Sequence, residues 1–231
     1  MKKHILFYSG GKDSHYVLYK LLKKKIKPIC LNLVPLSFVD GIKYFNTPYK
    51  KELIEIQSKL MGIDIFYFKL EKKLMSFFRK NHSLFLEKLF SRLQQLFGDM
   101  DVYIANDKND IKIDYEKVKL IKSIAKVNGI NLVFPLKNMD LDDIISETSK
   151  YGIKSVCIGI EKPEFFNLVG KTIDFEFLKI VKENGIKGEH IQSFVIESPL
   201  FNGTKIEITS FRKKRIRDRC FLEIFNYHLR R

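Results

Sequence analysis

Short apolar runs and helically spaced apolar residues alternate through the first 137 residues of the chain. A short apolar run bounded by turn residues is typical of a buried strand, and apolar residues three and four positions apart are typical of an amphipathic helix. The alternation predicts an α/β fold with a Rossmann-like, doubly wound parallel sheet and crossover helices. The predicted strands cover residues 4–8, 27–34, 63–68, 101–105 and 130–134, and the predicted helices cover residues 15–22, 48–61, 71–97 and 115–127.

The regular alternation ends near residues 135–140. Acidic residues at 140–143 suit the first turn of a further helix, which Gly152 would end. The pattern therefore predicts two domains, an α/β domain of residues 1–137 and a smaller C-terminal α+β domain of residues 138–231. The other elements predicted in the second domain are strands at residues 153–160, 194–196 and 205–209 and a helix at residues 175–181.

The stretch Ser9–Ser14 lies between the first predicted strand and the first predicted helix and reads Ser-Gly-Gly-Lys-Asp-Ser. Its glycines permit positive φ angles and the close approach of a ligand. The N–H groups of Gly10, Gly11 and Lys12 would lie at a helix N-terminus, which attracts anions, and the Lys12 ammonium and two serine hydroxyls add donors. Asp13 would repel a phosphate but suits Mg²⁺, which binds carboxylates and phosphates together. The stretch therefore predicts a phosphate site with a metal ion at Asp13.

The spacing of this loop differs from that of a Walker A loop. It resembles the Ser-Gly-Gly-x-Asp-Ser signature of the PP-loop ATP pyrophosphatases, the adenine nucleotide α-hydrolase superfamily, which implies a HUP-type fold. The resemblance implies that ATP is cleaved between its α and β phosphates, with ATP and Mg²⁺ as cofactors and with Lys12 and Asp13 as catalytic residues. AMP would pass to a substrate oxygen and leave when a nitrogen or sulfur nucleophile attacks. The implied ATP-binding residues are Ser9, Gly10, Gly11, Lys12, Asp13 and Ser14.

Further segments resemble the diphthine–ammonia ligase family of PP-loop proteins, in order along nearly the whole chain. Residues 45–48, followed by a helix with Gln57 and by residues 61–63, resemble its aromatic-His-Thr-Pro segment, with Asn46 in place of the His. Residues 188–201 resemble its second signature, with Gln192 for a His or Glu, Ser193 for the usual Thr and Glu197 for the usual Asp. Residues 134–140 and 168–174 resemble two shorter segments of the family.

This second resemblance implies an amide ligase that adenylates the carboxylate of diphthine on translation elongation factor 2 and amidates it with ammonia. The first domain would bind ATP and the second domain the substrate. Glu189 and His190 would be catalytic and would take a proton from the attacking nitrogen. The implied substrate-binding residues are Asn46, Thr47, Gln192, Ser193 and Glu197.

The net charge of +15 indicates either an acidic partner or the lysine-rich composition that an AT-rich genome produces. Acidic residues interleave with the lysines along most of the chain. The exception is the basic run at residues 212–219, which would either dock an acidic macromolecule or lie in water as a solvated segment.

Two alternatives to the amide ligase stay open. One is a PP-loop tRNA-modifying enzyme of the thiolation or lysidine type, for which nucleic acid would be a partner. The other is a nucleotide-binding module without activity.

The three cysteines, Cys30, Cys157 and Cys220, are far apart in the sequence, which argues against a zinc site or a disulfide scaffold and fits a reducing cytoplasm. No signal peptide or membrane-spanning run is visible, so we expect a cytoplasmic protein. Cys30 and Cys157 lie in predicted buried strands, whereas Cys220 follows the basic run, whose charges would lower its pKa. Since no second cysteine accompanies Cys220, we predict chemistry that does not use cysteine.

Overall fold

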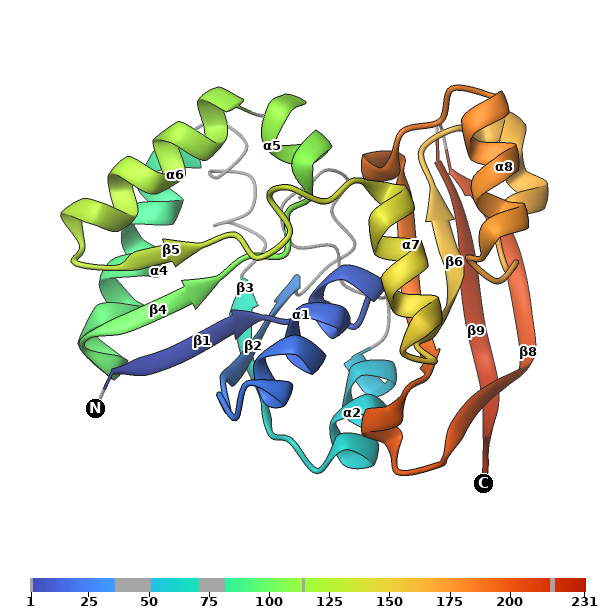
Figure 1. Ribbon diagram of the computed structural model, residues 1–231, viewed down its shortest axis with the longest axis horizontal. Coiled ribbons are helices and arrows are strands. Elements are labelled where there is room, and N and C mark those ends of the chain that lie inside the picture. The colour runs from blue at the N-terminus through green and yellow to red at the C-terminus, as the bar shows by residue number, and fades with distance from the viewer. Residues whose placement is uncertain (1, 36–50, 71–81, 114, 217–218) are drawn as a thin grey trace.

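The first sheet is fully parallel, as the alternation of strands and helices predicts. The computed structural model describes residues 2–35, 51–70, 82–113, 115–216 and 219–231 (Figure 1). The strand order is β3-β2-β1-β4-β5. The five strands are β1 (Lys3–Phe7), β2 (Ile29–Pro35), β3 (Ile65–Leu70), β4 (Met100–Tyr103) and β5 (Asn131–Val133).

Helices cover both faces of this sheet, because successive side chains of a strand point to opposite faces. Ile5 and Phe7 of β1 join an apolar cluster with α4 and α6, whereas Leu6 and the following Tyr8 join a second cluster with α1 and α2. The doubly wound α/β fold is thus confirmed. The helices of this part are α1 (Lys12–Lys23), α2 (Lys51–Met61), α4 (His82–Phe97), α5 (Lys108–Ile113) and α6 (Tyr115–Val127).

The second sheet is antiparallel, with the strand order β7-β6-β9-β8. Its strands are β6 (Lys154–Ile160), β7 (Ile191–Glu197), β8 (Lys205–Ile216) and β9 (Arg219–Arg230). The sequence pattern missed β9 and the second half of β8, since their charged residues hide the apolar alternation. The helical elements here are α7 (Leu141–Lys150), α8 (Phe175–Glu183) and the short turns η1 (Pro163–Leu168), η2 (Gly188–His190) and η3 (Pro199–Phe201).

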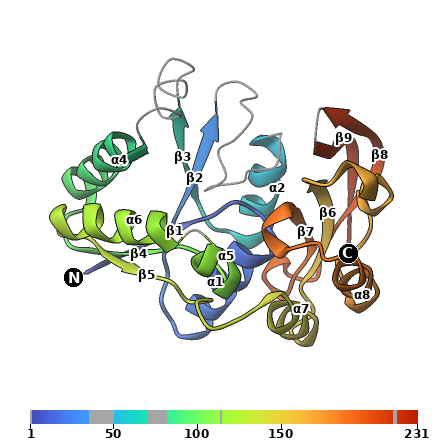
Figure 2. The same cartoon turned by 90° about the horizontal axis from the view of Figure 1, so that it is seen from above.

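Helix α1 packs between the two sheets. One apolar cluster contains Leu18 of α1, Ile144 of α7 and Phe194 of β7. Figure 2 shows the second sheet beside α1 and α2 and far from α4 and α6. All strands of the first sheet precede residue 137 and all strands of the second follow it, while the division into two domains there stays a prediction. No helix among the described residues is long and apolar enough to cross a membrane.

The order of the strands places the candidate site. Strand β1 lies between β2 and β4, so the connections after β1 and β4 leave the sheet on opposite sides of a topological switch point. In open α/β sheets ligands collect at the carboxyl ends of the strands at such a point. The stretch Ser9–Ser14 follows β1, and Asp107 follows β4.

Candidate functional site

The turn from β1 into α1 requires glycine at position 10. Gly10 has a φ of +79°, in the left-handed region that side chains rarely adopt. A Cβ atom on Gly10 would collide with the side chain of Ile54 and lie 2.7 Å from Oε1 of Gln57. Gly11 is the N-cap of α1 and has no side chain with which to cap the helix itself. The first turn of α1 therefore presents backbone N–H groups and the positive end of the helix dipole.

The two serines of the loop hold the turn together. The Ser9 N–H donates to Oγ of Ser14 over 3.1 Å, and the two hydroxyl oxygens are 3.0 Å apart. Oγ of Ser14 also lies 3.2 Å from the carbonyl oxygen of Gly11, to which it can donate. In this structure the hydroxyls predicted to bind phosphate thus brace the loop from within.

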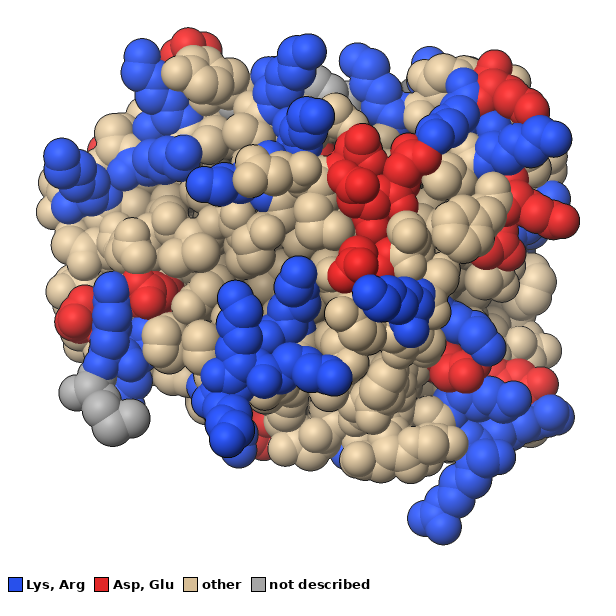
Figure 3. Space-filling model, in the orientation of Figure 1, with Lys and Arg blue, Asp and Glu red and all other residues tan. Residues whose placement is uncertain are grey.

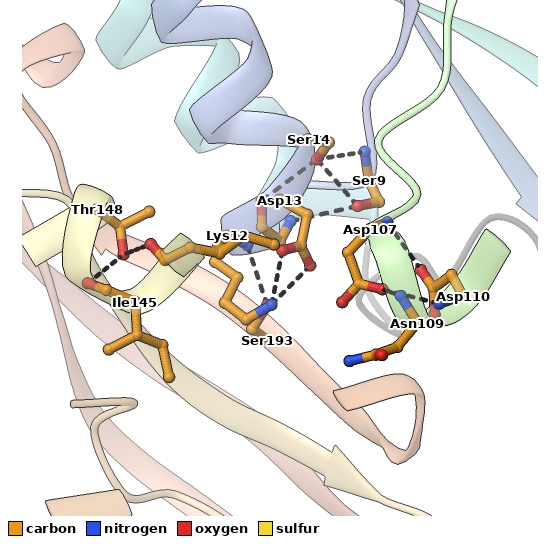
Figure 4. A network of polar contacts seen from close by, with 12 residues as sticks. Ser9, Lys12, Asp13, Ser14, Asp107, Asn109, Asp110, Ile145, Thr148 and Ser193 are labelled. Carbon is orange, nitrogen blue, oxygen red and sulfur yellow. Dashed lines mark hydrogen bonds and ion pairs between the residues drawn. The ribbon is translucent and has the colours of Figure 1, made fainter. Parts of the chain in front are cut away.

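Lys12 and Asp13 form an ion pair at the first turn of α1. Nζ of Lys12 lies 2.6 and 2.8 Å from the two carboxylate oxygens of Asp13 (Figure 4). Lys12 is 4% exposed, whereas one third of the Asp13 side chain is exposed. The pair keeps a buried ammonium neutralised while leaving the carboxylate accessible from solvent.

Two further carboxylates near the loop were not predicted. Asp107 accepts hydrogen bonds of 2.8 Å from the N–H groups of Asn109 and Asp110 and so begins α5. Burial raises the pKa of Asp107, and the charge of Asp13 raises it further. Burial also raises the pKa of Asp110 to about 7, with added repulsion from Asp107 and Asp13. The three carboxylates therefore share one electrostatic environment beside Lys12 (Figure 4).

The sequence carried one signal for Asp107, a carboxylate two residues after the end of the fourth predicted strand. Its closeness to Asp13 depends on β4 lying next to β1, and the strand order is not readable from local patterns.

The carboxylates fit a Mg²⁺ ion that arrives with a nucleotide. Magnesium in such sites takes one or two protein carboxylates, substrate phosphates and water. Asp13 and Asp107 supply two carboxylates whose mutual repulsion a cation would relieve. Among the described residues no group of three or more acidic, His or Cys side chains could hold a metal ion by itself. The donor set therefore suits a metal bound jointly with phosphates.

Strand β7 lies directly against the loop. Val195 N–H donates to the carbonyl oxygen of Gly10 over 3.0 Å, and the Lys12 N–H donates to Oγ of Ser193 over 3.0 Å. A Cβ atom on Gly11 would lie 3.0 Å from the backbone oxygen of Ser193. Ser193, predicted to bind substrate, is thus in contact with the predicted ATP loop.

The predicted catalytic pair Glu189–His190 lies in η2, which packs against α5. A Cβ atom on the neighbouring Gly188 would lie 3.7 Å from Oδ2 of Asp107, so this turn reaches the carboxylate group beside the loop. Nδ1 of His190 lies 3.4 Å from Oε2 of Glu161. Only the backbone of Glu189 is described. The side chain of Gln192 lies against Gly159 of β6, where an added Cβ would be 2.8 Å from its Oε1.

Glu197, another predicted substrate residue, takes part in contacts away from the loop. Glu197 pairs with Lys154 over 3.0 Å and lines a separate cavity of about 290 Å³ with Lys205 and Glu207. Asn46 and Thr47 lie outside the described residues.

The net pKa of Cys220 is raised, although the basic run supplies a neighbour that acts to lower it. Its side chain is fully buried, and burial raises the pKa of the thiol more than Arg215 lowers it. Burial raises the pKa of Cys30 and of Cys157 to about 12. All three are free thiols with little thiolate at neutral pH.

Residues 212–216 of the basic run belong to β8 and Arg219 begins β9, and acidic residues partly neutralise these cations. Arg212 and Lys214 each lie 2.8 Å from Oε2 of Glu223, and Arg219 lies 2.9 Å from Oε1 of Glu161. Figure 3 shows Lys and Arg side chains over much of the visible face, several of them gathered near its lower edge, with acidic side chains between them in places. The charges are thus more interleaved in space than in sequence.

No protein-family model and no curated protein matches this chain. Among solved structures, it is similar to a protein described as a predicted subunit of tRNA methyltransferase from Methanocaldococcus jannaschii. The two share 18% identity over 85% of this chain and 98% of that chain, with a TM-score of 0.49. It is also similar to glutamine-dependent NAD⁺ synthetase from Acinetobacter baumannii in complex with ADP. This match has 14% identity over 64% of this chain and 28% of that chain, with a TM-score of 0.43. Neither likeness identifies the family or the activity of this chain.

Proposed function

We propose that the protein is an ATP-dependent amide ligase of the diphthine–ammonia ligase kind. The observation that supports this most is the contact between Lys12 and Ser193. It joins a phosphate loop to the segment that resembles the substrate signature of that family. An adenylating ligase needs its nucleotide and its acceptor side by side, because positioning turns a bimolecular attack into an effectively unimolecular one.

The proposed reaction has two steps. A carboxylate oxygen of the acceptor attacks the α-phosphorus of ATP, a new oxygen–phosphorus bond forms, and the bond to the bridging oxygen breaks to release pyrophosphate. Ammonia then attacks the carbonyl carbon of the acyl adenylate. AMP leaves with the electron pair of the carbon–oxygen bond, and the nitrogen loses a proton to give the amide.

The loop would serve the first step. The first turn of α1 and the Lys12 ammonium would stabilise the charge of the departing pyrophosphate. Asp13 and Asp107 would hold Mg²⁺, which when bound neutralises phosphate charge. Glu189 or His190 would accept the proton of the attacking ammonia.

The proposed acceptor is the diphthine carboxylate of elongation factor 2, on the basis of the sequence resemblance. The burial of all three cysteines favours nitrogen over sulfur as the nucleophile, since sulfur delivery needs a reactive thiolate or a metal cluster. A tRNA acceptor is the main competing hypothesis and is one arm of the test.

The test is product analysis. The protein is incubated with ATP, Mg²⁺ and ammonium, with diphthine-bearing elongation factor 2, with tRNA, or with neither. We expect AMP and pyrophosphate in equal amounts only with elongation factor 2, and conversion of its carboxyl to a carboxamide by mass spectrometry. Asp13→Asn should form both products roughly 10²–10³-fold more slowly than the wild type. ADP and phosphate, AMP only with tRNA, or no turnover in any arm would overturn the proposal.

A further inference from the structure

Four buried polar side chains lie behind the phosphate loop, and the proposed reaction uses none of them. Tyr8, His15 and Gln57 are at most 1% exposed and Ser198 is 5% exposed. They come from four places in the chain: the end of β1, α1, α2 and the end of β7. Buried polar groups are costly unless each finds a hydrogen-bond partner.

Gln57 joins the loop to strand β7. Its Nε2 donates to the carbonyl oxygens of Gly10, over 3.1 Å, and of Val195, over 2.8 Å. Carbonyl oxygens only accept, so the amide nitrogen must face them and Oε1 must face Tyr8, whose hydroxyl lies 2.9 Å away. The Val195 N–H also donates to Gly10. Gly10, Gln57 and Val195 therefore form a closed triangle of hydrogen bonds.

The hydrogen bonds beyond Gln57 have only one consistent direction. Tyr8 has a single hydroxyl proton and donates it to Gln57, so its oxygen accepts from Nδ1–H of His15 over 2.9 Å. The other ring nitrogen, Nε2, must then accept from the Ser198 hydroxyl, which is 2.7 Å away. The Leu200 N–H completes the chain by donating to Oγ of Ser198 over 3.1 Å.

His15 fits this chain because it is neutral. Burial lowers its pKa to about 3, so the ring carries one donor and one acceptor near neutral pH. Its ring edge also packs on Phe201 of η3, with ring centroids 5.3 Å apart. The chain thus runs from η3 through α1 and α2 to the carbonyl oxygens of the loop and of β7.

We propose that Gln57, Tyr8 and His15 are positioning residues that hold strand β7 on the loop Ser9–Ser14. This inference rests on the proposed function. They act through backbone groups of Gly10 and Val195, two residues from Ser193. A displacement of β7 on the scale of one ångström would separate acceptor from nucleotide and slow the transfer. ATP binding depends less on them, since Ser9 and Ser14 brace the loop independently.

Tyr16 provides a matched control. Its hydroxyl donates to Oε2 of Glu147 over 2.7 Å, a bond that joins α1 to α7. Tyr8→Phe and Tyr16→Phe each remove one hydroxyl from a tyrosine that is at most 1% exposed. They differ in whether the lost hydroxyl belongs to the chain behind the loop.

Three measurements test the proposal. In Gln57→Leu, amide hydrogen exchange at Val195 should quicken by about tenfold, the scale of one lost hydrogen bond. In Gln57→Leu and Tyr8→Phe, AMP formation with the acceptor should fall by roughly 10- to 100-fold while the ATP dissociation constant changes less than about threefold. Tyr16→Phe should keep both wild-type values. Nitrogen NMR of His15 should show the Nδ1–H tautomer.

The outcomes separate this proposal from the function on which it rests. Unchanged exchange at Val195, the Nε2–H tautomer, or an equal loss of AMP formation in Tyr16→Phe would each overturn it. If the wild-type protein forms no AMP with any acceptor, the proposed function fails instead. The exchange and tautomer measurements need only the protein itself. They then still decide whether this chain of hydrogen bonds holds β7 on the loop.

Discussion

The hydroxyl oxygen of Ser193 accepts a hydrogen bond from the backbone N–H of Lys12 over 3.0 Å, although 181 positions separate the two residues. This bond satisfies one of the N–H groups at the start of α1, where the N-cap residue, Gly11, has no side chain to do so. We expect Ser193→Ala to lower the free energy of unfolding by roughly 1 kcal/mol, measured by urea titration. Ser193→Thr keeps the hydroxyl and should retain both stability and AMP formation. A threonine variant as impaired as the alanine variant would contradict the role of the hydroxyl.

Removal of either charge at the first turn of α1 should slow AMP formation. We expect Lys12→Ala and Asp13→Ala each to cost roughly 10²–10³ in rate, the usual scale for one preorganised charge-stabilising group. Steady-state kinetics with the acceptor measures this loss. The control is Lys24→Ala at the exposed C-cap of the same helix, which should behave like the wild type. Unchanged turnover in both loop variants would remove the loop from the mechanism.

Asp110 should make the protein less stable as the pH rises. Its pKa is about 7 in the folded protein, against about 4 for a free aspartate. At a pH between these two pKa values the folded state binds more protons than the unfolded state. The free energy of unfolding therefore falls as the pH rises from about 4 to about 7. Asp110→Asn should therefore flatten this part of the pH profile and raise stability at pH 8 relative to the wild type. Urea midpoints from pH 4 to pH 8 give the test, and parallel profiles for the two proteins would contradict it.

The cysteines should be dispensable. A protein with Cys30, Cys157 and Cys220 all changed to Ala should still form AMP with its acceptor, because buried thiols with raised pKa values make poor nucleophiles. In the native wild type the three should react slowly with a thiol reagent and rapidly only after unfolding. Loss of turnover in Cys220→Ser with intact ATP binding and circular dichroism would make sulfur transfer the leading hypothesis.

The β8–β9 hairpin should assist docking of an acidic partner only in part, because Glu223 engages two of its cations. Arg212→Gln with Lys214→Gln should slow association with elongation factor 2 at low salt and have little effect at high salt. Glu223→Gln should speed this association, because it removes the carboxylate that pairs with Arg212 and Lys214. Lys119→Gln with Lys122→Gln on α6 is the matched control. Equal association rates in all these variants at every ionic strength would assign the hairpin to the solvated surface.

The fold class was predictable because short apolar runs and helical spacing are local signals. The capping of helices was also local. Asp140 and Asp174 accept from the N–H groups of Asp143 and Phe177 and begin α7 and α8 close to the predicted positions. Strand β9 was not predictable in this way, since it pairs with a strand whose own apolar pattern is interrupted by the basic run.

The candidate site was predictable only where a sequence motif names its residues, as the loop motif names Lys12 and the second signature names Ser193. Asp107 belongs to the site because β4 lies next to β1. Gln57 belongs to it through hydrogen bonds with Gly10 and Val195, which are 47 and 138 positions away in the sequence. Such pairings are set by the packing of the whole chain. For the same reason Glu197 belongs by sequence to the second signature but lies on a different cavity.

The position of β7 at the border of the second sheet has a consequence for self-association. An exposed strand border presents unpaired backbone groups to other molecules and invites intermolecular strand pairing. Here the phosphate loop and Gln57 bond to backbone groups of β7 at Val195, and this border is partly covered. The opposite border, β8, carries cationic side chains and register shifts near Ser210, both of which discourage addition of another strand. The sheet is thereby shielded against growth into aggregates at both of its borders.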